Sequence, residues 1–235
     1  MPIGLNIAFS GSSGSELYIK NHHAKAVPMT TPPRDEFLDS LHPNPFAQFG
    51  LWHDEAVTAN LPQPNAMTLA TSTRDGKPSA RIVLMKWIDH LGLTFVTNYQ
   101  SRKGREIDEN PFVALTFHWA GLERQVRIEG TISRLTPEDS DRLFAARPRD
   151  HQLSSLSSKQ SEPTSLADLN ARYTELDKQF HGREIPRPVH WGGCLVSPNS
   201  FEFWQHRFAR MNDRVLYARK VLAGSVTWER VRLAP

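Results

Sequence analysis

Cysteine is almost missing from this sequence, with Cys194 the only one in 235 residues. One thiol excludes an internal disulfide and any zinc or iron–sulfur site built from several cysteines, and it suits a reducing cytoplasm. The ten histidines do not replace it, because none follows the HExxH pattern or a comparable metal-ligand spacing. We therefore predict a cytoplasmic protein without a metal centre.

Long apolar runs and a strong charge excess are missing as well. No stretch approaches the roughly 18 apolar residues of a membrane span, and no basic segment precedes the apolar IGLNIAF as in a secretory signal. The 28 basic and 25 acidic residues leave a formal net charge of only +3. Because this balance does not attract nucleic acid, we expect neither a membrane nor a nucleic acid as partner.

Phosphate-binding loops are a third absence. Neither GxGxxG after a strand nor GxxxxGKS/T occurs, so side chains would have to hold any phosphate. Arg81 and Lys86 are candidates because a positive charge on an otherwise apolar strand needs a partner. Five residues apart, they face opposite sides of a regular strand; either a bulge intervenes or they serve different ligands or parts of one ligand. Arg102 and Lys103 begin a helix and are further candidates. For any one of these cations taken alone, a solvated surface charge is the simpler interpretation.

The first 43 residues differ in composition from the rest. They contain SGSSGS and PMTTPP and no sustained hydrophobic period, which predicts a flexible N-terminal arm over residues 1–43. Regular patterns begin at residue 44, where Asn44 can cap a helix and Pro45 suits its first position. No internal repeat follows, so residues 44–235 are predicted to form a single domain.

Val, Ile, Thr and Phe dominate the runs after this helix. Strands are predicted at AMTLATST, ARIVLMKW, GLTFVTN, FVALTFHW, RQVRIEGTISRL, GGCLVS, SFEFWQ, RVLYAR and VTWERVRL. Helices are predicted after Ser101, after Thr136 and in SLADLNARYTELDKQF, and the Asp-Gly turn of TRDGKP closes a hairpin. Consecutive strands with tight turns and late helices favour a mostly β (α+β) fold: an antiparallel barrel with peripheral helices.

Nine segments stand in an order that one known family shares. They are RIVLMK, TNYQSRKGREIDENP, LERQVRIEG, RPRDHQ, SKQSEP, WGG, FEFWQ, NDRVLYAR and the terminal RLAP. Together they resemble the pyridoxine (pyridoxamine) 5'-phosphate oxidase family of flavoproteins, from about Asn44 to Pro235. The resemblance implies an FMN-binding split β-barrel and a homodimer with FMN at the interface. It also implies oxidation of pyridoxamine or pyridoxine 5'-phosphate to pyridoxal 5'-phosphate, with oxygen as acceptor and hydrogen peroxide as by-product.

The resemblance also implies which residues bind FMN. The matching positions are Arg81, Ile82, Val83, Leu84, Met85, Lys86, Val96, Thr97, Arg102, Lys103, Gln125, Gln160, Ser161, Trp204 and Arg214. Several of those from Gln125 onward are expected from the opposing subunit. Taken alone, Gln125 would equally be an outward polar residue of its strand. Trp204 taken alone is better explained as a core or interface aromatic.

Substrate-binding positions follow from the same resemblance. They are Lys86, Leu143, Arg147, His151, Arg210 and Asn212, with Arg210 and Asn212 also implied as catalytic residues. Leu143 stands for a family tyrosine, His151 for a serine and Asn212 for a histidine. Asparagine donates and accepts hydrogen bonds but exchanges no proton near neutral pH. In the arm, Arg34 and Phe37 match an expected Arg-x-x-Tyr element only faintly.

These departures leave three hypotheses. The first is the vitamin B6 oxidase itself. The second is a related FMN-dependent oxidase of a different substrate, such as a reduced phenazine precursor, because Leu143 suits an apolar ring and the departures all lie in the substrate pocket. The third is a non-catalytic protein that binds FMN or pyridoxal phosphate and has lost turnover. Next to Asn212, Asp213 either orients an arginine or is a plain turn residue.

Overall fold

The computed structural model describes residues 34–222 and 224–235. Residues 35–235 form one compact unit, and residues 1–33 of the predicted arm lie outside the described residues. The strands are β1 (Ala66–Ser72), β2 (Pro78–Asp89), β3 (Gly92–Asn98), β4 (Phe112–Trp119), β5 (Arg124–Arg134), β6 (Trp191–Gln205), β7 (Asp213–Leu222) and β8 (Ser225–Arg232). The helices are α1 (Glu36–Ser40), α2 (Pro45–Thr58), α3 (Arg102–Glu109), α4 (Pro137–Ala145), α5 (Arg149–Ser157) and α6 (Leu166–Gln179), with short 3-10 turns η1 (Ala120–Leu122) and η2 (Phe208–Arg210).

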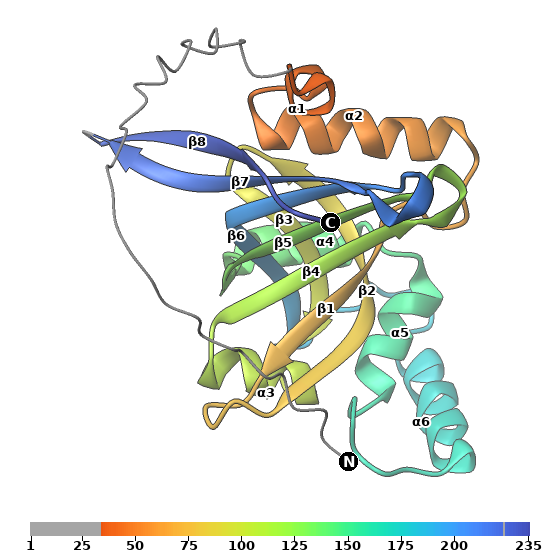
Figure 1. Cartoon of the computed structure of the whole chain (residues 1–235). Helices are drawn as coiled ribbons and strands as arrows, with labels where there is room; N and C mark the ends of the chain where they lie inside the picture. Colours follow the sequence, from red (N-terminus) through yellow and green to blue (C-terminus); the bar gives the residue numbers. More distant parts are fainter. Residues whose placement is uncertain (1–33, 223) are drawn as a thin grey trace, which may run out of the picture. The chain divides into compact units, whose positions relative to one another are not determined.

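The described strands form one antiparallel sheet in the order β3-β2-β1-β4-β5-β6-β7-β8. Because β3 also pairs with β6, the strands from β1 to β6 close into a barrel. The strands β7 and β8 continue from β6 as a hairpin outside it (Figure 1). The predicted mostly β fold, an antiparallel barrel with peripheral helices, is confirmed. Within the described ranges, no helix is both long enough and apolar enough to cross a membrane.

Alternation along the strands builds the barrel core. In β5, Val126 and Ile128 are buried while Arg127 between them is exposed, as expected for a strand with one solvated face. Helix α2 packs aromatic side chains onto this core. Its Phe49 ring lies edge-on to Phe117, with ring centroids 4.8 Å apart.

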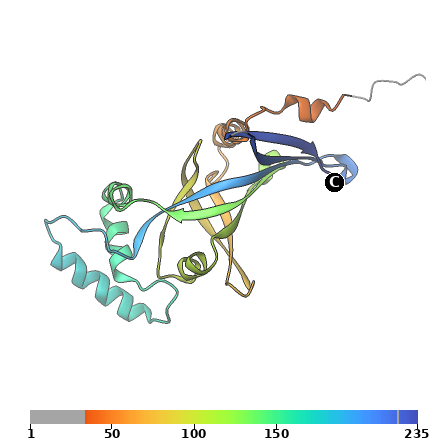
Figure 2. The ribbon, with the colours of Figure 1, turned by 90° about the vertical axis from the view of Figure 1, so that its left-hand side faces the viewer.

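A smaller apolar cluster lies beside the barrel and holds the later helices. Residues of α4, α5 and α6 meet the start of β6 there, and the buried members are Phe144, Leu153, Leu176, Ile185 and Trp191. The ring of Phe144 packs edge-on against Trp191 at 5.2 Å. Figure 2 shows these teal helices gathered at one end of the unit, away from the blue hairpin. The cluster thus fixes α5 beside the end of β3 and the start of β6.

The helix caps predicted from the sequence are confirmed. The side chains of Asn44, Ser101 and Thr136 each accept a hydrogen bond from a backbone N–H in the first turn of α2, α3 and α4. The predicted hairpin turn is also present, with Gly76 at φ +83° between β1 and β2.

Two strand and helix boundaries differ from the expectations. GGCLVS and SFEFWQ form one strand, β6, instead of two. Gly130 pairs with Pro198 and Glu129 with Ser200, so Asn199 is accommodated as a bulge and the strand continues. Helix α5 was not predicted, because only Leu153 in it is buried and no apolar period marks it.

The folded unit also begins earlier than residue 43. Asp35 caps α1 by accepting a hydrogen bond from Leu38 N at 3.0 Å, and Leu41 is buried in the main core. Arg230 of β8 donates to the backbone oxygens of Leu38 and Leu41 at 3.1 and 2.9 Å. These contacts move the expected boundary of the arm to Asp35.

Candidate functional site

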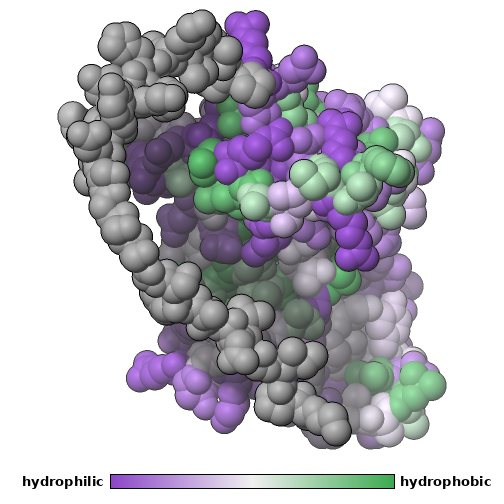
Figure 3. Space-filling model, viewed as in Figure 1, coloured by the Kyte–Doolittle hydropathy of each residue, from purple (hydrophilic) through white to green (hydrophobic). Residues whose placement is uncertain are grey.

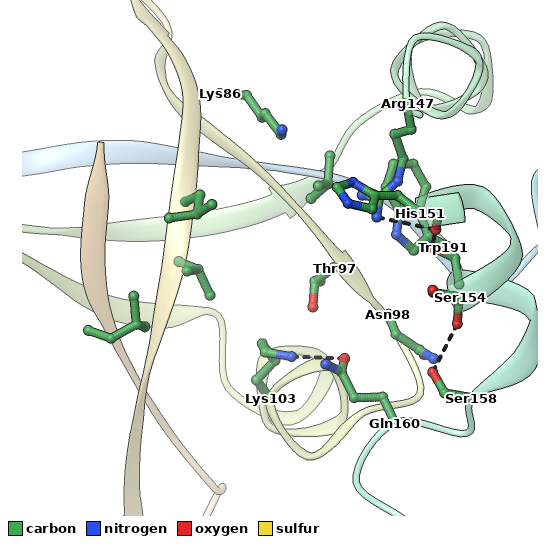
Figure 4. Close-up of a pocket in the computed structure, with 15 residues that line it drawn as sticks. Lys86, Thr97, Asn98, Lys103, Arg147, His151, Ser154, Ser158, Gln160 and Trp191 are labelled. Atoms are coloured by element: carbon green, nitrogen blue, oxygen red, sulfur yellow. Dashed lines mark hydrogen bonds between the residues drawn. The ribbon is translucent and has the colours of Figure 1, made fainter. Parts of the chain in front are cut away.

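A cavity of about 480 Å³ lies between strands β2 and β3 and helices α3 and α5 (Figure 4). Its wall consists of Ile82, Val83, Leu84, Lys86, Val96, Thr97, Asn98, Lys103, Arg147, His151, Ser154, Ser155, Ser158, Gln160 and Trp191. Predicted cofactor positions of β2, β3 and α3 therefore meet at one place, together with Arg147 and His151 from the predicted substrate set. The cavity has an apolar side on β2 and a polar, cationic side on the helices.

Arg81 and Lys86 of strand β2, the two cations that the sequence analysis selected, lie in different surroundings. Lys86 lines the cavity, but Arg81 does not. The bulge that the sequence allowed is present: the β2–β3 register shifts between Met85 and Trp87, with Lys86 as the extra residue. Since the bulge comes at Lys86 itself, the two cations keep different surroundings. Lys86 is exposed toward the cavity, and Arg81 contacts α3.

Lys103 is a buried cation at the cavity's lower edge in Figure 4. Its Nζ donates to Ser101 Oγ and to Gln160 Oε1, both at 3.1 Å. Burial, and then repulsion from Arg81, lower the pKa of Lys103 to about 8. In the described part of the chain its hydrogen-bond partners are both neutral, so this ammonium lacks a counter-anion.

Behind Lys103, Glu106 ties the neighbouring arginines together. Its buried carboxylate forms ion pairs with Arg81 at 3.2 Å and Arg102 at 2.8 Å. Burial by itself would raise the pKa of Glu106, but hydrogen bonds from Ser79, Thr71 and the two arginines lower it to about 2. The carboxylate is consequently ionised at all physiological pH values.

Arg147 and His151 form a second cationic corner on α5 and the turn before it. The Arg147 guanidinium lies 4.9 Å over the Trp191 ring, and its Nη2 donates weakly to the His151 backbone oxygen at 3.4 Å. Its Nε is buried without a hydrogen-bond partner among the described residues. Burial lowers the pKa of Arg147 from its usual value. An unsatisfied guanidinium donor in a cavity wall is suited to an anionic ligand.

Three predicted cofactor residues lie away from the cavity, in a row across the sheet. Gln125 of β5 pairs with Trp204 of β6, which pairs with Arg214 of β7, so their side chains share one face. Arg214 Nε donates to the buried carboxylate of Glu202 at 2.8 Å, and this bond raises the pKa of Arg214.

The loop between β6 and β7 holds the predicted catalytic residues, also outside the cavity wall. Arg210 is exposed and has a left-handed backbone at φ +62°. Asn212 Oδ1 accepts a hydrogen bond from Arg207 N at 3.0 Å, which closes the loop. Asp213 forms ion pairs with Arg207 and with Arg232. Asp213 therefore orients arginines, which decides between the two interpretations of its role.

Models of known protein families match two separate segments of this chain. A family model described as pyridoxamine 5'-phosphate oxidase matches residues 53–176, and a model described as pyridoxine 5'-phosphate oxidase C-terminal dimerisation region matches residues 191–235. The chain belongs to the pyridoxamine 5'-phosphate oxidase family. Its C-terminal match supports formation of a homodimer by this member of the family.

Relatives of the pyridoxamine 5'-phosphate oxidase family share about half of the residues. A pyridoxine/pyridoxamine 5'-phosphate oxidase from Rubrobacter xylanophilus is 53% identical over 84% of this chain and 89% of its own length. One from Burkholderia thailandensis is 52% identical over 83% and 91%. Among solved structures, PhzG from Burkholderia lata, in complex with tetrahydrophenazine-1-carboxylic acid, has a TM-score of 0.79 and 29% identity, covering 90% of this chain and 100% of its own. An FMN-binding protein from Nostoc punctiforme, with a TM-score of 0.65 and 15% identity over 83% and 100%, shares the fold.

Other predicted family positions do not line the cavity. Met85 is buried in the barrel core, and Leu143 packs against the smaller apolar cluster. Arg102 and Ser161 meet at the edge of α3, where Arg102 N donates to Ser161 Oγ at 3.1 Å. In α1, Phe37 packs on the main core under the Arg207 guanidinium, 5.8 Å away.

Sequence reasoning missed five residues of the cavity wall. They are Asn98, Ser154, Ser155, Ser158 and Trp191. Trp191 stands in the family segment WGG and could have been taken from it. The serines had a weaker signal. In SSLSS, Ser154, Ser155 and Ser158 are spaced so that they lie near one face if the segment is a helix. That α5 is a helix had to be known first.

Proposed function

We propose that this protein is an FMN-dependent oxidase that converts pyridoxamine or pyridoxine 5'-phosphate to pyridoxal 5'-phosphate. Oxygen is the electron acceptor and hydrogen peroxide the second product. The observation that carries the proposal is the pair of cationic corners in one cavity, Lys103 at one and Arg147 with His151 at the other. Two such corners suit a cofactor phosphate and a substrate phosphate, and relatives about half identical are named for this activity.

The residues at the first corner fit the phosphate of FMN. Lys103 is buried, charged and without an acidic hydrogen-bond partner in the described ranges. It lies in the first turn of α3, where the helix dipole also favours an anion. Bound FMN supplies an acceptor for a hydride from the substrate carbon. Along β2 and β3, the apolar and backbone groups of Ile82, Leu84 and Val96 would position the flavin ring.

The second corner fits the substrate phosphate. Lys86 and Arg147 provide charge, and the unpaired Nε of Arg147 provides a donor. Leu143 contributes no hydroxyl group, which by itself would weaken binding by roughly 1.5–3 kcal/mol. His151 lines the same wall and can donate from its imidazole ring, which offsets part of that loss.

The remaining family positions are assigned to the second subunit of a homodimer. The match to the dimerisation region includes Trp204 and Arg214, and these residues do not reach the cavity of their own chain. We assign the row that contains them, and the loop with Arg210 and Asn212, to the cavity of the partner. With its Oδ1 engaged by Arg207 N, Asn212 retains its amide nitrogen as a hydrogen-bond donor toward substrate.

Anaerobic flavin reduction tests the proposed reaction. Purified protein with FMN is mixed with pyridoxamine or pyridoxine 5'-phosphate without oxygen, and loss of the yellow flavin absorbance is followed. We expect bleaching, and recovery of colour with peroxide release when oxygen is admitted. Arg147→Gln should raise KM about tenfold or more, whereas Arg149→Gln, whose guanidinium bonds to Arg183, Asp177 and Phe180 outside the cavity, should not. No bleaching with either substrate would contradict the proposal.

A second candidate is an FMN-dependent oxidase of a tricyclic substrate. It is favoured by the likeness to PhzG, whose structure contains tetrahydrophenazine-1-carboxylic acid, and by the apolar Leu143. A panel of reduced ring carboxylates and vitamin phosphates separates the two. Much faster reduction of the flavin by a ring carboxylate would decide for the second candidate.

A substitution at Asn212 distinguishes both oxidase candidates from a non-catalytic protein that binds FMN without turnover. Asn212→His restores a group that can exchange a proton near neutral pH. If the protein is a retuned oxidase, the substitution should increase kcat for the vitamin phosphates while FMN affinity stays the same. A protein that binds FMN stoichiometrically, but gives no peroxide with any substrate before or after the substitution, would be a binder.

A further inference from the structure

Glu106 of α3 is a buried carboxylate surrounded by donors. Its side chain is 5% exposed, and the hydroxyl groups of Thr71 and Ser79 each donate to Oε2 at 2.5 Å. Arg81 donates to the same oxygen at 3.2 Å, and Arg102 donates to Oε1 at 2.8 Å. Both oxygens are thus engaged by side chains from β1, β2 and the first turn of α3.

The guanidinium of Arg81 is fixed by this arrangement. Nη1 donates to the backbone oxygen of Leu69 at 3.3 Å and to Thr71 Oγ1 at 2.5 Å. Nη2 donates to Ser79 Oγ and Glu106 Oε2. These bonds use the hydrogens of both terminal nitrogens and leave the Nε hydrogen. Arg81 can therefore neither rotate nor move away without breaking its contacts to Glu106.

Arg81 is close enough to a third cation, Lys103, to repel its charge, and Arg102 precedes Lys103 in the chain. Lys103 is buried and lines the cavity, and repulsion from Arg81 adds to burial in lowering its pKa. Glu106 is the carboxylate in hydrogen-bond contact with both arginines. The group of three cations and one carboxylate keeps an excess of positive charge beside the cavity.

We propose that Glu106 is a positioning residue for a phosphate monoester: it fixes Arg81 and Arg102 and so preorganises the positive charge around Lys103. The inference rests on the proposed function, since the phosphate is that of FMN. Without the shared carboxylate the guanidinium groups repel one another and Lys103. Binding would then have to order them, at a cost in side-chain entropy.

Glu106→Gln acts on phosphate binding in two opposite directions. It removes a negative charge, which by Coulomb attraction alone tightens binding of an anion. It also removes the charge-assisted hydrogen bonds that order the arginines, which weakens binding. The sign of the measured change therefore distinguishes positioning from a plain charge effect.

The test measures the affinity of the apoprotein for FMN and for riboflavin, which has the same ring but no phosphate, by quenching of flavin fluorescence. We expect E106Q to weaken FMN binding about tenfold or more and to leave riboflavin binding unchanged. E109Q, an exposed glutamate of the same helix, should change neither affinity. Ser79→Ala removes one bond to Glu106 and one to Arg81; it should weaken FMN binding in the same direction, and it replaces E106Q if that variant does not fold.

Two outcomes overturn the inference while the proposed function stands. Unchanged or tighter FMN binding by E106Q would show that Glu106 acts by its charge alone or not at all. Equal loss of both flavins, together with a lower Tm, would show a purely structural role. A wild-type protein that binds neither flavin would instead overturn the proposed function, and this inference with it.

Discussion

The free-energy cost of burying the charged form of Lys103 depends on whether the cavity contains an anion. Its folded pKa of about 8 is below the usual value of 10.5, so in the ligand-free protein it releases its proton at lower pH than in the unfolded chain. Burial of the charged form therefore destabilises the ligand-free fold most below about pH 8, and this destabilisation decreases as the pH rises from about 8 to 10.5. A bound dianion reverses this preference, because it favours the ammonium.

Binding of FMN should consequently take up a proton above pH 8. Below about pH 8 Lys103 is already charged, and affinity is flat as long as the phosphate is a dianion, above its pKa of about 6. Above pH 8 we expect affinity to fall by up to about tenfold per pH unit. Calorimetric titrations from pH 7 to pH 10 measure this slope.

A matched pair of lysine variants provides the control for that slope. Lys103→Met should bind FMN weakly and with little change between pH 8 and pH 10. Lys159→Met, at a side chain 84% exposed, should keep the wild-type profile. The same slope in Lys103→Met would assign the proton to another group.

At the scale of single elements, the end of β3 and the start of α3 are packed backbone to backbone. A Cβ at Gly104 would lie 1.9 Å from the backbone oxygen of Tyr99. In α2, a Cβ at Gly50 would meet nothing within 4 Å. Both glycines are helical, so intrinsic helix propensity alone predicts that alanine stabilises both positions.

Gly104→Ala and Gly50→Ala should therefore change stability in opposite directions. Gly104→Ala forces α3 away from the strand end and should destabilise the protein by about 2 kcal/mol or more. Gly50→Ala should stabilise it by about 0.5–1 kcal/mol. Urea unfolding of both variants measures the difference, and a stabilising Gly104→Ala would mean that α3 is not held against Tyr99. FMN affinity should fall with Gly104→Ala, since Lys103 moves with the helix.

The sequence determined the strands and the caps of this fold because their signals are local. Period-two runs, an Asp-Gly turn, and Asn44 or Ser101 before a helix act within a few residues. Contacts between distant segments have no such signal. Within RKGREIDE, Glu106 resembles any charged helix residue, and only the docking of α3 on β1 and β2 brings it to Arg81.

Site prediction was limited for the same reason. The family resemblance supplied residues of β2, β3 and α3 that do meet at the cavity, together with Arg147 and His151. The resemblance did not predict helix α5. Serines occupy positions of α5 that face the cavity, so the sequence there lacks the apolar period that usually indicates a helix. Roles of Gln125, Trp204 and Arg214 stay predictions, because they depend on a second subunit.

At the scale of the whole molecule, the proposed site needs two chains. If Lys103 serves one cavity and Arg214 the cavity of the other subunit, variants at these positions should complement each other. Lys103→Met and Arg214→Ala homodimers should each be nearly inactive. After unfolding and refolding together, half of the dimers are mixed, and one of their two sites has neither substitution, so activity should recover to about a quarter of wild type.

Measured FMN stoichiometry after the same mixing checks this arrangement independently of turnover. A mixture of Arg214→Ala with Gln125→Ala, a second variant from the row that we assign to the partner's cavity, gives the matched control. Both sites of the mixed dimer then have one substitution, so no intact site is expected. Absence of recovery in the first mixture, with dimers shown to exchange subunits, would place both residues in one cavity of a single chain.

The β3–β6 pairing that closes the barrel also has a consequence for the order of synthesis. Val96, Thr97 and Asn98 of the cavity wall pair with Gly193, Gly192 and Trp191, which leave the ribosome long after them. Contacts between such distant segments form slowly, because a long loop must first be closed. A nascent chain that ends before β6 has most of the wall residues but lacks the strand that closes the barrel beside β3, so we expect it to bind FMN only after the last fifth of the polypeptide emerges.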